Sequence, residues 1–246
     1  MPIKVEKSGP HLTITLVSPD TSNALNVDMV EALISTLSNV DDVRSCVFLG
    51  EGQNFCAGFD LSDIDVLSDG DLLHRFLRIE TMLQMIYHAP FPTLAFCQGH
   101  VIGAGADLMA ACWKRVADPS ATFKMPGWNF ELALGTRRLA NLIGSEQARD
   151  LLIDTRRIAA EEALSIGLVS RVAAQSSWAE IIESQIRRSV ILPRFSSSTM
   201  FGLTRPDTRA QDIASIVATA GRPGLNDRIK AYGTSVAAAR QQRKGV

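Results

Sequence analysis

The sequence predicts an α/β protein, and two observations indicate this fold class. Strand-like and helix-like patterns alternate from the N-terminus to about Leu139, and almost everything beyond that residue has a helical pattern. Alternation of this kind is typical of parallel sheets with helical crossover connections. With 246 residues, of which 46% are hydrophobic and 21% charged, the chain has the composition of one large globular domain.

The first half of the chain supplies the predicted strands and two amphipathic helices. A hairpin is expected over residues 3–19, because apolar residues alternate in its second half. A helix is expected from Val27 to Asn39 with Asn26 as its cap, because apolar residues recur there with a helical period. The other elements expected here are a strand at 43–50, a helix at 71–88, a strand at 89–99, a helix after Val101 and an extended piece at 115–123.

The last third of the chain is predicted to be mostly helical. Residues 158–172 indicate a helix that stops at Gly167 and a short strand after it. Between Trp178 and Gln242 we expect two or three helices, interrupted at 191–195, 204–207 and 221–224. These helices can pack on the rest of the domain or on a neighbouring chain.

Charge and composition exclude several classes of partner. A net charge of -1 gives no reason to expect binding to nucleic acid or to an anionic membrane. The N-terminus has no apolar signal core, and no segment approaches the roughly 18 apolar residues of a membrane helix. The four cysteines have no CxxC spacing, so neither a zinc site nor a redox dithiol is expected. We therefore expect a cytoplasmic protein without a bound metal.

Common cofactor and nucleophile motifs are missing as well. The segment GAGADL at Gly103–Leu108 is not a dinucleotide-binding fingerprint, because Leu108 stands where the third glycine belongs. The chain has no phosphate-binding loop of the GxxxxGK type and no GxSxG serine nucleophile. The chemistry must therefore depend on other residues.

Two loops rich in small residues follow predicted strands. The first is GQNFCAGFDL at Gly52–Leu61, and the second is QGHVIGAGADL at Gln98–Leu108. Ligands bind at the carboxyl ends of strands in open α/β folds, and glycine turns expose backbone N–H groups there. Two such N–H groups that converge on one oxygen form an oxyanion hole, and a helix that starts near Ala104 adds its positive end.

These two loops contain two of five segments that resemble the crotonase superfamily, the enoyl-CoA hydratase/isomerase enzymes. The segments are NALN at Asn23–Asn26, NFCAGFDL at Asn54–Leu61, GAGADL at Gly103–Leu108, GTRRL at Gly135–Leu139 and EEALSIGLVSRV at Glu161–Val172. The resemblance implies a crotonase-like core of repeated ββα units over residues 1–190. It also implies a helical region over residues 191–246 that mediates a homo-trimer or a hexamer of two trimers.

The resemblance further implies an acyl-CoA thioester substrate, with coenzyme A as part of the substrate and no separate cofactor. The backbone N–H groups of Phe59 and Ala104 would hold the oxygen of a thioester enolate. Asp107 occupies the position of one catalytic carboxylate, although an acid in the first turn of a helix can also simply complement the helix dipole. The implied adenine and substrate contacts are Ala24, Leu25, Ala57, Asp60 and Leu61.

The chain departs from the family pattern at two places. Hydratases carry a second catalytic glutamate at the position of Gly127. Glu131 is a candidate replacement, with a solvated loop residue as the alternative, and Trp128 either lines the acyl pocket or packs in a core or interface. The family's basic residue before NAL is replaced by Asp20, so the phosphates of coenzyme A need other partners. The candidates are Arg228, Lys230 and the basic tail at 240–246 of a neighbouring chain.

These departures leave three functional hypotheses. The first is an enzyme of the hydratase/isomerase type in fatty acid metabolism that uses Asp107 and Glu131. The second is another enolate chemistry in the same oxyanion hole, such as decarboxylation or thioester hydrolysis. The third is a degenerate, non-catalytic subunit that binds acyl-CoA.

Overall fold

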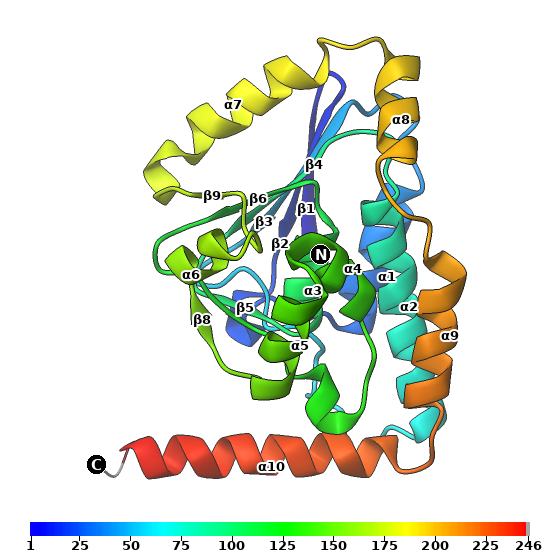
Figure 1. Cartoon of the computed structure of the whole chain (residues 1–246), viewed down its shortest axis with the longest axis vertical. Coiled ribbons are helices and arrows are strands. Elements are labelled where there is room, and N and C mark those ends of the chain that lie inside the picture. The colour runs from blue at the N-terminus through cyan, green and yellow to red at the C-terminus, as the bar shows by residue number, and fades with distance from the viewer. Residues whose placement is uncertain (245–246) are drawn as a thin grey trace.

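The computed structural model describes residues 1–244, with side chains as far as Val236. Figure 1 shows a mixed sheet packed between helices, followed by four helices that run around the outside of the body. The strands are β1 (Ile3–Ser8), β2 (His11–Leu16), β3 (Ser45–Gly50), β4 (Thr93–Cys97), β5 (His100–Ile102), β6 (Lys114–Ala117), β7 (Thr122–Lys124), β8 (Ile158–Ala159) and β9 (Arg171–Val172).

The α-helices of the described residues include the predicted pair in the first half of the chain. They are α1 (Val27–Leu37), α2 (Asp69–Tyr87), α3 (Ala104–Ala111), α4 (Thr136–Ile143), α5 (Ser145–Asp154), α6 (Ala160–Ser165), α7 (Trp178–Ser189), α8 (Arg194–Leu203), α9 (Arg209–Ala220) and α10 (Leu225–Lys244). The predicted cap of α1 is confirmed, because Asn26 Oδ1 accepts a hydrogen bond of 2.9 Å from the Met29 N–H. Every helix in the described part of the chain is too short or too polar to cross a membrane.

The strands form two sheets, and this confirms the predicted α/β class. The larger sheet has the order β1-β2-β3-β4-β6-β9, in which β1 and β2 are antiparallel and the other neighbours are parallel. The smaller sheet has the order β5-β7-β8, with β5 and β7 parallel and β8 antiparallel to β7. The extended piece predicted at 115–123 is therefore two strands, β6 and β7, which belong to different sheets.

Both faces of the central strands β3 and β4 are largely buried, as is usual for parallel strands. One face packs on the main core, which includes Phe48 of β3 and side chains from α1, α2 and α3. On the other face, Val47, Leu94 and Phe96 pack against Trp178 of α7 in a second apolar cluster. Because side chains alternate along a strand, the neighbouring residues Val47 and Phe48 pack in different cores on opposite faces of the sheet.

The C-terminal region contains four helices, so the expectation of two or three is wrong. The breaks at residues 191–195, 204–207 and 221–224 each contain a proline, which cannot continue a helix. Each break therefore separates two helices, α7 from α8, α8 from α9 and α9 from α10. In Figure 1, α9 runs beside α2, and α10 crosses the end of the body where the small sheet and α5 lie.

Candidate active site

The two small-residue loops approach each other at Gly58 and Gly103. Both glycines have positive φ, +88° and +54°. A Cβ on Gly58 would lie 2.4 Å from the Ile102 carbonyl oxygen and 3.2 Å from the Ala104 nitrogen. Gly58 therefore permits a backbone approach between the loops that a larger residue would block.

This approach places the backbone that leads into Phe59 next to the backbone nitrogen of Ala104. Ala104 is the first residue of α3, so its N–H has no partner within the helix. Leu25 pairs with Phe59 in a parallel bridge, in which the Leu25 N–H donates to the Gly58 carbonyl at 2.7 Å. In such a bridge Leu25 bonds to the residues on either side of Phe59, so the Phe59 N–H faces away from Leu25.

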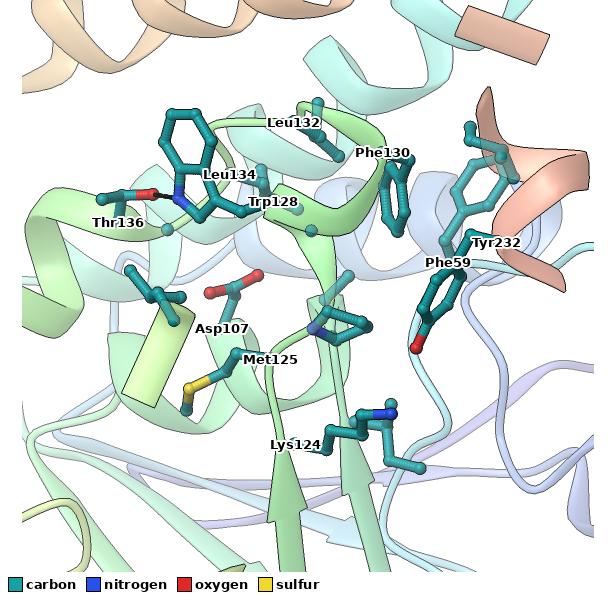
Figure 2. A pocket seen from close by; sticks show the side chains of 18 of the residues that line it. Phe59, Asp107, Lys124, Met125, Trp128, Phe130, Leu132, Leu134, Thr136 and Tyr232 are labelled. Atoms are coloured by element: carbon teal, nitrogen blue, oxygen red, sulfur yellow. Dashed lines mark hydrogen bonds between the residues drawn. The ribbon is translucent and has the colours of Figure 1, made fainter. Parts of the chain in front are cut away.

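A cavity of about 260 Å³ is lined by both Phe59 and Ala104. Its walls come from α3, β7, the loop 125–136 and α10, and they are mostly apolar. Figure 2 shows the side chains around it, with Asp107 on the side of Met125 and Trp128, and Lys124 on the side of Phe59 and Tyr232. Phe59 stacks on Phe76 with 4.6 Å between the ring centroids. The cavity thus combines a mostly apolar wall with one carboxylate, and it is lined by both predicted oxyanion-hole residues.

Asp107 is the only acidic residue that lines the cavity within the described part of the chain. A Cβ on Gly135 would lie 1.8 Å from its Oδ1, so the carboxylate occupies space that only a glycine leaves empty. Among the described residues, none makes a hydrogen bond that contributes to the pKa of this carboxylate. Burial raises the pKa of Asp107 to about 8, with a further rise from Glu80 and an opposing effect of Arg138. The Asp107 carboxyl group can therefore gain or lose a proton near neutral pH.

A buried ion pair lies next to Asp107. Glu80 of α2 accepts two hydrogen bonds from Arg138 of α4, at 2.7 and 2.6 Å, and both side chains are excluded from solvent. Asp212 of α9 lies 3.4 Å from the same guanidinium. The Nε of Arg138 has no hydrogen-bond partner among the described residues. Because Glu80 already neutralises Arg138, Asp107 is left without an ion-pair partner of its own.

Glu131 lies apart from Asp107, so the structure does not bring the two predicted carboxylates together. Its carboxylate is 2.6 Å from Arg222 and 3.6 Å from Arg228, and its side chain does not line the cavity. Glu131 ends the 3-10 helix η2 (Gly127–Phe130) in a left-handed conformation, φ +59°, which directs it toward the C-terminal helices. Gly127 does line the cavity, so the position of the family's second glutamate faces the site without a carboxylate.

The predicted contact residues divide into two groups. Ala57, Leu61 and Trp128 line the cavity, and the Trp128 Nε1 donates to the Thr136 hydroxyl at 3.1 Å. Trp128 is 42% exposed, so it does not lie in a core of this chain. The others do not reach the cavity. Ala24 and Leu25 are buried behind the Phe59 loop, and Asp60 accepts hydrogen bonds from Ser62.

The predicted phosphate partners are engaged elsewhere. Lys230 lies 3.1 Å from Asp65, and Arg228 lies near Glu131 and donates to backbone carbonyls. In the tail 240–246 the side chains lie outside the described residues. Neither described candidate is therefore a free cation beside the cavity.

Several cavity residues were missed from the sequence. Lys124 is the last residue of β7, and Met125 follows it. Because side chains alternate along a strand, the sequence pattern could have placed Lys124 on the same face as Thr122. Phe130 and Tyr232 pack together with 5.5 Å between ring centroids, although about a hundred residues separate them in the chain. No local signal could have found that pairing.

The fold and the site together define a crotonase-type protein, an α/β core with two glycine turns that meet beside an apolar cavity. The chain belongs to the enoyl-CoA hydratase/isomerase family, whose model matches residues 7–196. It is 35% identical over 176 residues, 68% of this chain and 70% of the relative, to the Mycobacterium tuberculosis protein echA6, named for the enoyl-CoA hydratases.

Two further comparisons extend over most of the chain. A solved structure of a Bordetella parapertussis protein named for the same family is 39% identical, with a TM-score of 0.93, and the match covers 94% of this chain and 98% of that one. The 4-chlorobenzoyl coenzyme A dehalogenase-1 of Arthrobacter is 26% identical over 257 residues, 94% of this chain and 90% of the relative. Relatives with different named reactions therefore share this family's sequence pattern.

Proposed function

We propose that the protein is an acyl-CoA thioester enzyme that forms a thioester enolate and moves one proton with Asp107. The N–H groups of Phe59 and Ala104 hold the enolate oxygen, because donors aimed at developing charge stabilise the transition state. The observation that supports this proposal is a single carboxylate without an ion-pair partner, in a mostly apolar cavity that Phe59 and Ala104 also line.

One carboxylate favours proton transfer over hydration. Addition of water to a double bond uses an acid and a base placed on either side of the substrate. Gly127 supplies no such group, and Glu131 is paired with Arg222 outside the cavity. A single carboxylate with a pKa of about 8 is suited to take a proton from one carbon and return it to another. The proposed reaction is therefore isomerisation of an enoyl thioester, with no cofactor beyond the coenzyme A of the substrate.

Deuterium exchange tests this proposal. The purified protein is incubated in D₂O with butyryl-CoA, crotonyl-CoA and vinylacetyl-CoA, and deuterium at Cα is followed by mass spectrometry while products are separated by chromatography. We expect exchange at Cα and conversion of the vinylacetyl thioester, with little hydration of crotonyl-CoA. If no thioester shows exchange or product formation, the result would favour the hypothesis of a non-catalytic subunit that binds acyl-CoA.

Loss of one donor tests the oxyanion hole. Ala104→Pro removes the N–H at the first helical position, where proline is well tolerated. The exchange rate should fall by about 10²–10³, the usual cost of one lost oxyanion donor. Circular dichroism checks that the variant is folded. An unchanged rate in a folded variant would remove Ala104 from the site.

We also propose that the chain assembles through its C-terminal helices into a trimer or hexamer. The support is a set of exposed apolar residues at the α7–α8 turn and on α8, with Ile191 72%, Phe195 80% and Leu203 81% exposed. Exposed apolar surface of this kind marks interaction sites. Light scattering at micromolar concentration should give a trimer or larger. A cytoplasmic location and a role in fatty acid metabolism remain parts of the proposal.

A further inference from the structure

Two cationic residues of the small sheet and its flank line the cavity. Lys124 and Arg157 both line it. The antiparallel register of β7 and β8 pairs Thr122 with Ala159 and Phe123 with Ile158, so Arg157 follows opposite Lys124. Because side chains alternate along a strand, Lys124 shares its face with Thr122 and not with the buried Phe123. The backbone register therefore places these two cationic residues at neighbouring positions, and both reach the same cavity.

Neither cation has an acidic partner among the described residues. Lys124 contacts the Tyr232 ring, with its Nζ 5.8 Å from the ring centroid, but it makes no ion pair. Arg157 donates to the Thr122 hydroxyl at 2.8 Å, and its guanidinium lies 2.9 Å from His100 Nδ1, so neither contact supplies a negative charge. Two adjacent cations without a counter-charge repel each other and concentrate positive potential at one place.

These cations lie close to the predicted oxyanion hole. Lys124 is opposite Ile102 in the parallel register of β5 and β7. Its carbonyl accepts a hydrogen bond of 2.8 Å from the Gly103 N–H, one residue before Ala104. Figure 2 places the Lys124 side chain near Tyr232 and Phe59, on the side of the cavity away from Asp107. A thioester whose carbonyl lies at Ala104 would therefore pass within reach of this charge.

We propose that Lys124 and Arg157 form an anion subsite, which binds a carboxylate or phosphate group carried by the bound thioester. This inference rests on the proposed acyl-CoA function. Arg157 supplies a planar donor for a bidentate contact with such a group, and Lys124 adds a point charge beside it. The anionic group comes either from the acyl chain, which makes the substrate a dicarboxylic acyl thioester, or from the phosphates of coenzyme A.

Four stable probes distinguish the two sources. They are S-butyl-CoA, S-(3-carboxypropyl)-CoA and the corresponding thioethers of pantetheine, which lack the coenzyme A phosphates. Their affinities are measured by calorimetry at low and high salt. The variants are Lys124→Met and Arg157→Gln, each of which removes a charge with little change in length. The matched control is Arg156→Gln, because Arg156 is exposed, pairs with Glu162 and does not line the cavity.

Each outcome has a separate meaning. If the acyl chain supplies the anion, both variants should lose about tenfold or more in affinity for the carboxypropyl probes and little for the butyl probes. If the phosphates supply it, both coenzyme A probes should lose affinity equally while the pantetheine probes do not. Either loss should shrink at high salt.

Failure of the subsite is distinguishable from failure of the proposed function. Wild-type protein that binds the probes, with both variants binding them as Arg156→Gln does, would overturn the subsite alone. Wild-type protein that binds none of the coenzyme A thioethers would overturn the acyl-CoA function and the subsite with it. Circular dichroism of the variants checks the fold in either case.

Discussion

Gly135 leaves the space that the Asp107 carboxylate occupies. A Cβ on Gly135 would lie 1.8 Å from Oδ1 of Asp107 and 2.5 Å from its Cγ. Gly135 is also the N-cap of α4, so the carboxylate lies at the positive end of that helix. The position of the candidate acid–base group thus depends on a glycine that is distant in the sequence.

Gly135→Ala should therefore displace Asp107 and lower turnover or Cα exchange by about 10²-fold or more, since small misplacements of reacting groups have effects of this size. The strain of a side chain at φ +67° should also cost about 1–3 kcal/mol of stability. Gly144→Ala is the control, because Gly144 has φ +85° and nothing within 4 Å of its Cβ position. A similar loss of stability with unchanged exchange in both variants would contradict the contact with Asp107.

Asp107→Asn should change how stability depends on pH. The folded protein holds the Asp107 proton up to a pH of about 8, whereas the unfolded chain releases it near the ordinary value of 3.8. Because the folded state binds more protons between these values, the free energy of unfolding falls as the pH rises through this window and is level above it. The asparagine variant lacks this decline, so its melting temperature should rise relative to wild type from a pH of about 5 to about 8.

Asp63→Asn is a control for these thermal melts, because the pKa of Asp63 is shifted in the opposite direction. A hydrogen bond from Arg75 holds the pKa of Asp63 below its ordinary value, so that carboxylate contributes stability that is fully present above a pH of about 4. Its loss should lower the melting temperature by a constant amount between a pH of about 5 and about 8. A constant difference for Asp107→Asn as well would mean that Asp107 is ionised in the folded protein.

Glu80→Gln should lower the pKa of Asp107. Glu80 raises that pKa and neutralises Arg138, whose charge acts in the other direction. Without Glu80, the Arg138 charge is free to favour the Asp107 carboxylate. Infrared titration reports this pKa without reference to activity. The spectra of the wild-type and Glu80→Gln proteins are each compared with those of the same protein carrying the additional substitution Asp107→Asn. Asp212→Asn removes the more distant partner of Arg138 and should have the smaller effect. A pKa that is unchanged in Glu80→Gln would contradict this electrostatic coupling.

Glu131→Gln should be silent in exchange and turnover. Its carboxylate pairs with Arg222, and its side chain is 45% exposed, so the substitution should cost about 0–1 kcal/mol of stability. Asp107→Asn should by contrast reduce exchange by about 10²–10⁴, the usual contribution of a general acid or base. Rates and melts of the two variants are compared on the same thioester. Loss of exchange in Glu131→Gln would restore the hypothesis of two acting carboxylates.

Local patterns in the sequence determined much of the fold. The apolar period of α1 and its cap at Asn26, the strand at β3 and the helix α2 follow from periodicity and from residues that lie next to each other in the chain. The turns at Gly58 and Gly103 were predictable for the same reason, because a positive φ selects glycine locally. The family motifs added the expectation that these turns meet.

The tertiary structure alone decided which groups surround Asp107. Its pKa depends on burial, on Glu80 from α2 and on Arg138 from α4, which are brought together by packing and not by sequence spacing. The same packing pairs Glu131 with Arg222, 91 residues away, and so removes from the cavity a carboxylate that looked available in the sequence. Charge partners and desolvation are properties of the folded neighbourhood, and no pattern within one segment can specify them.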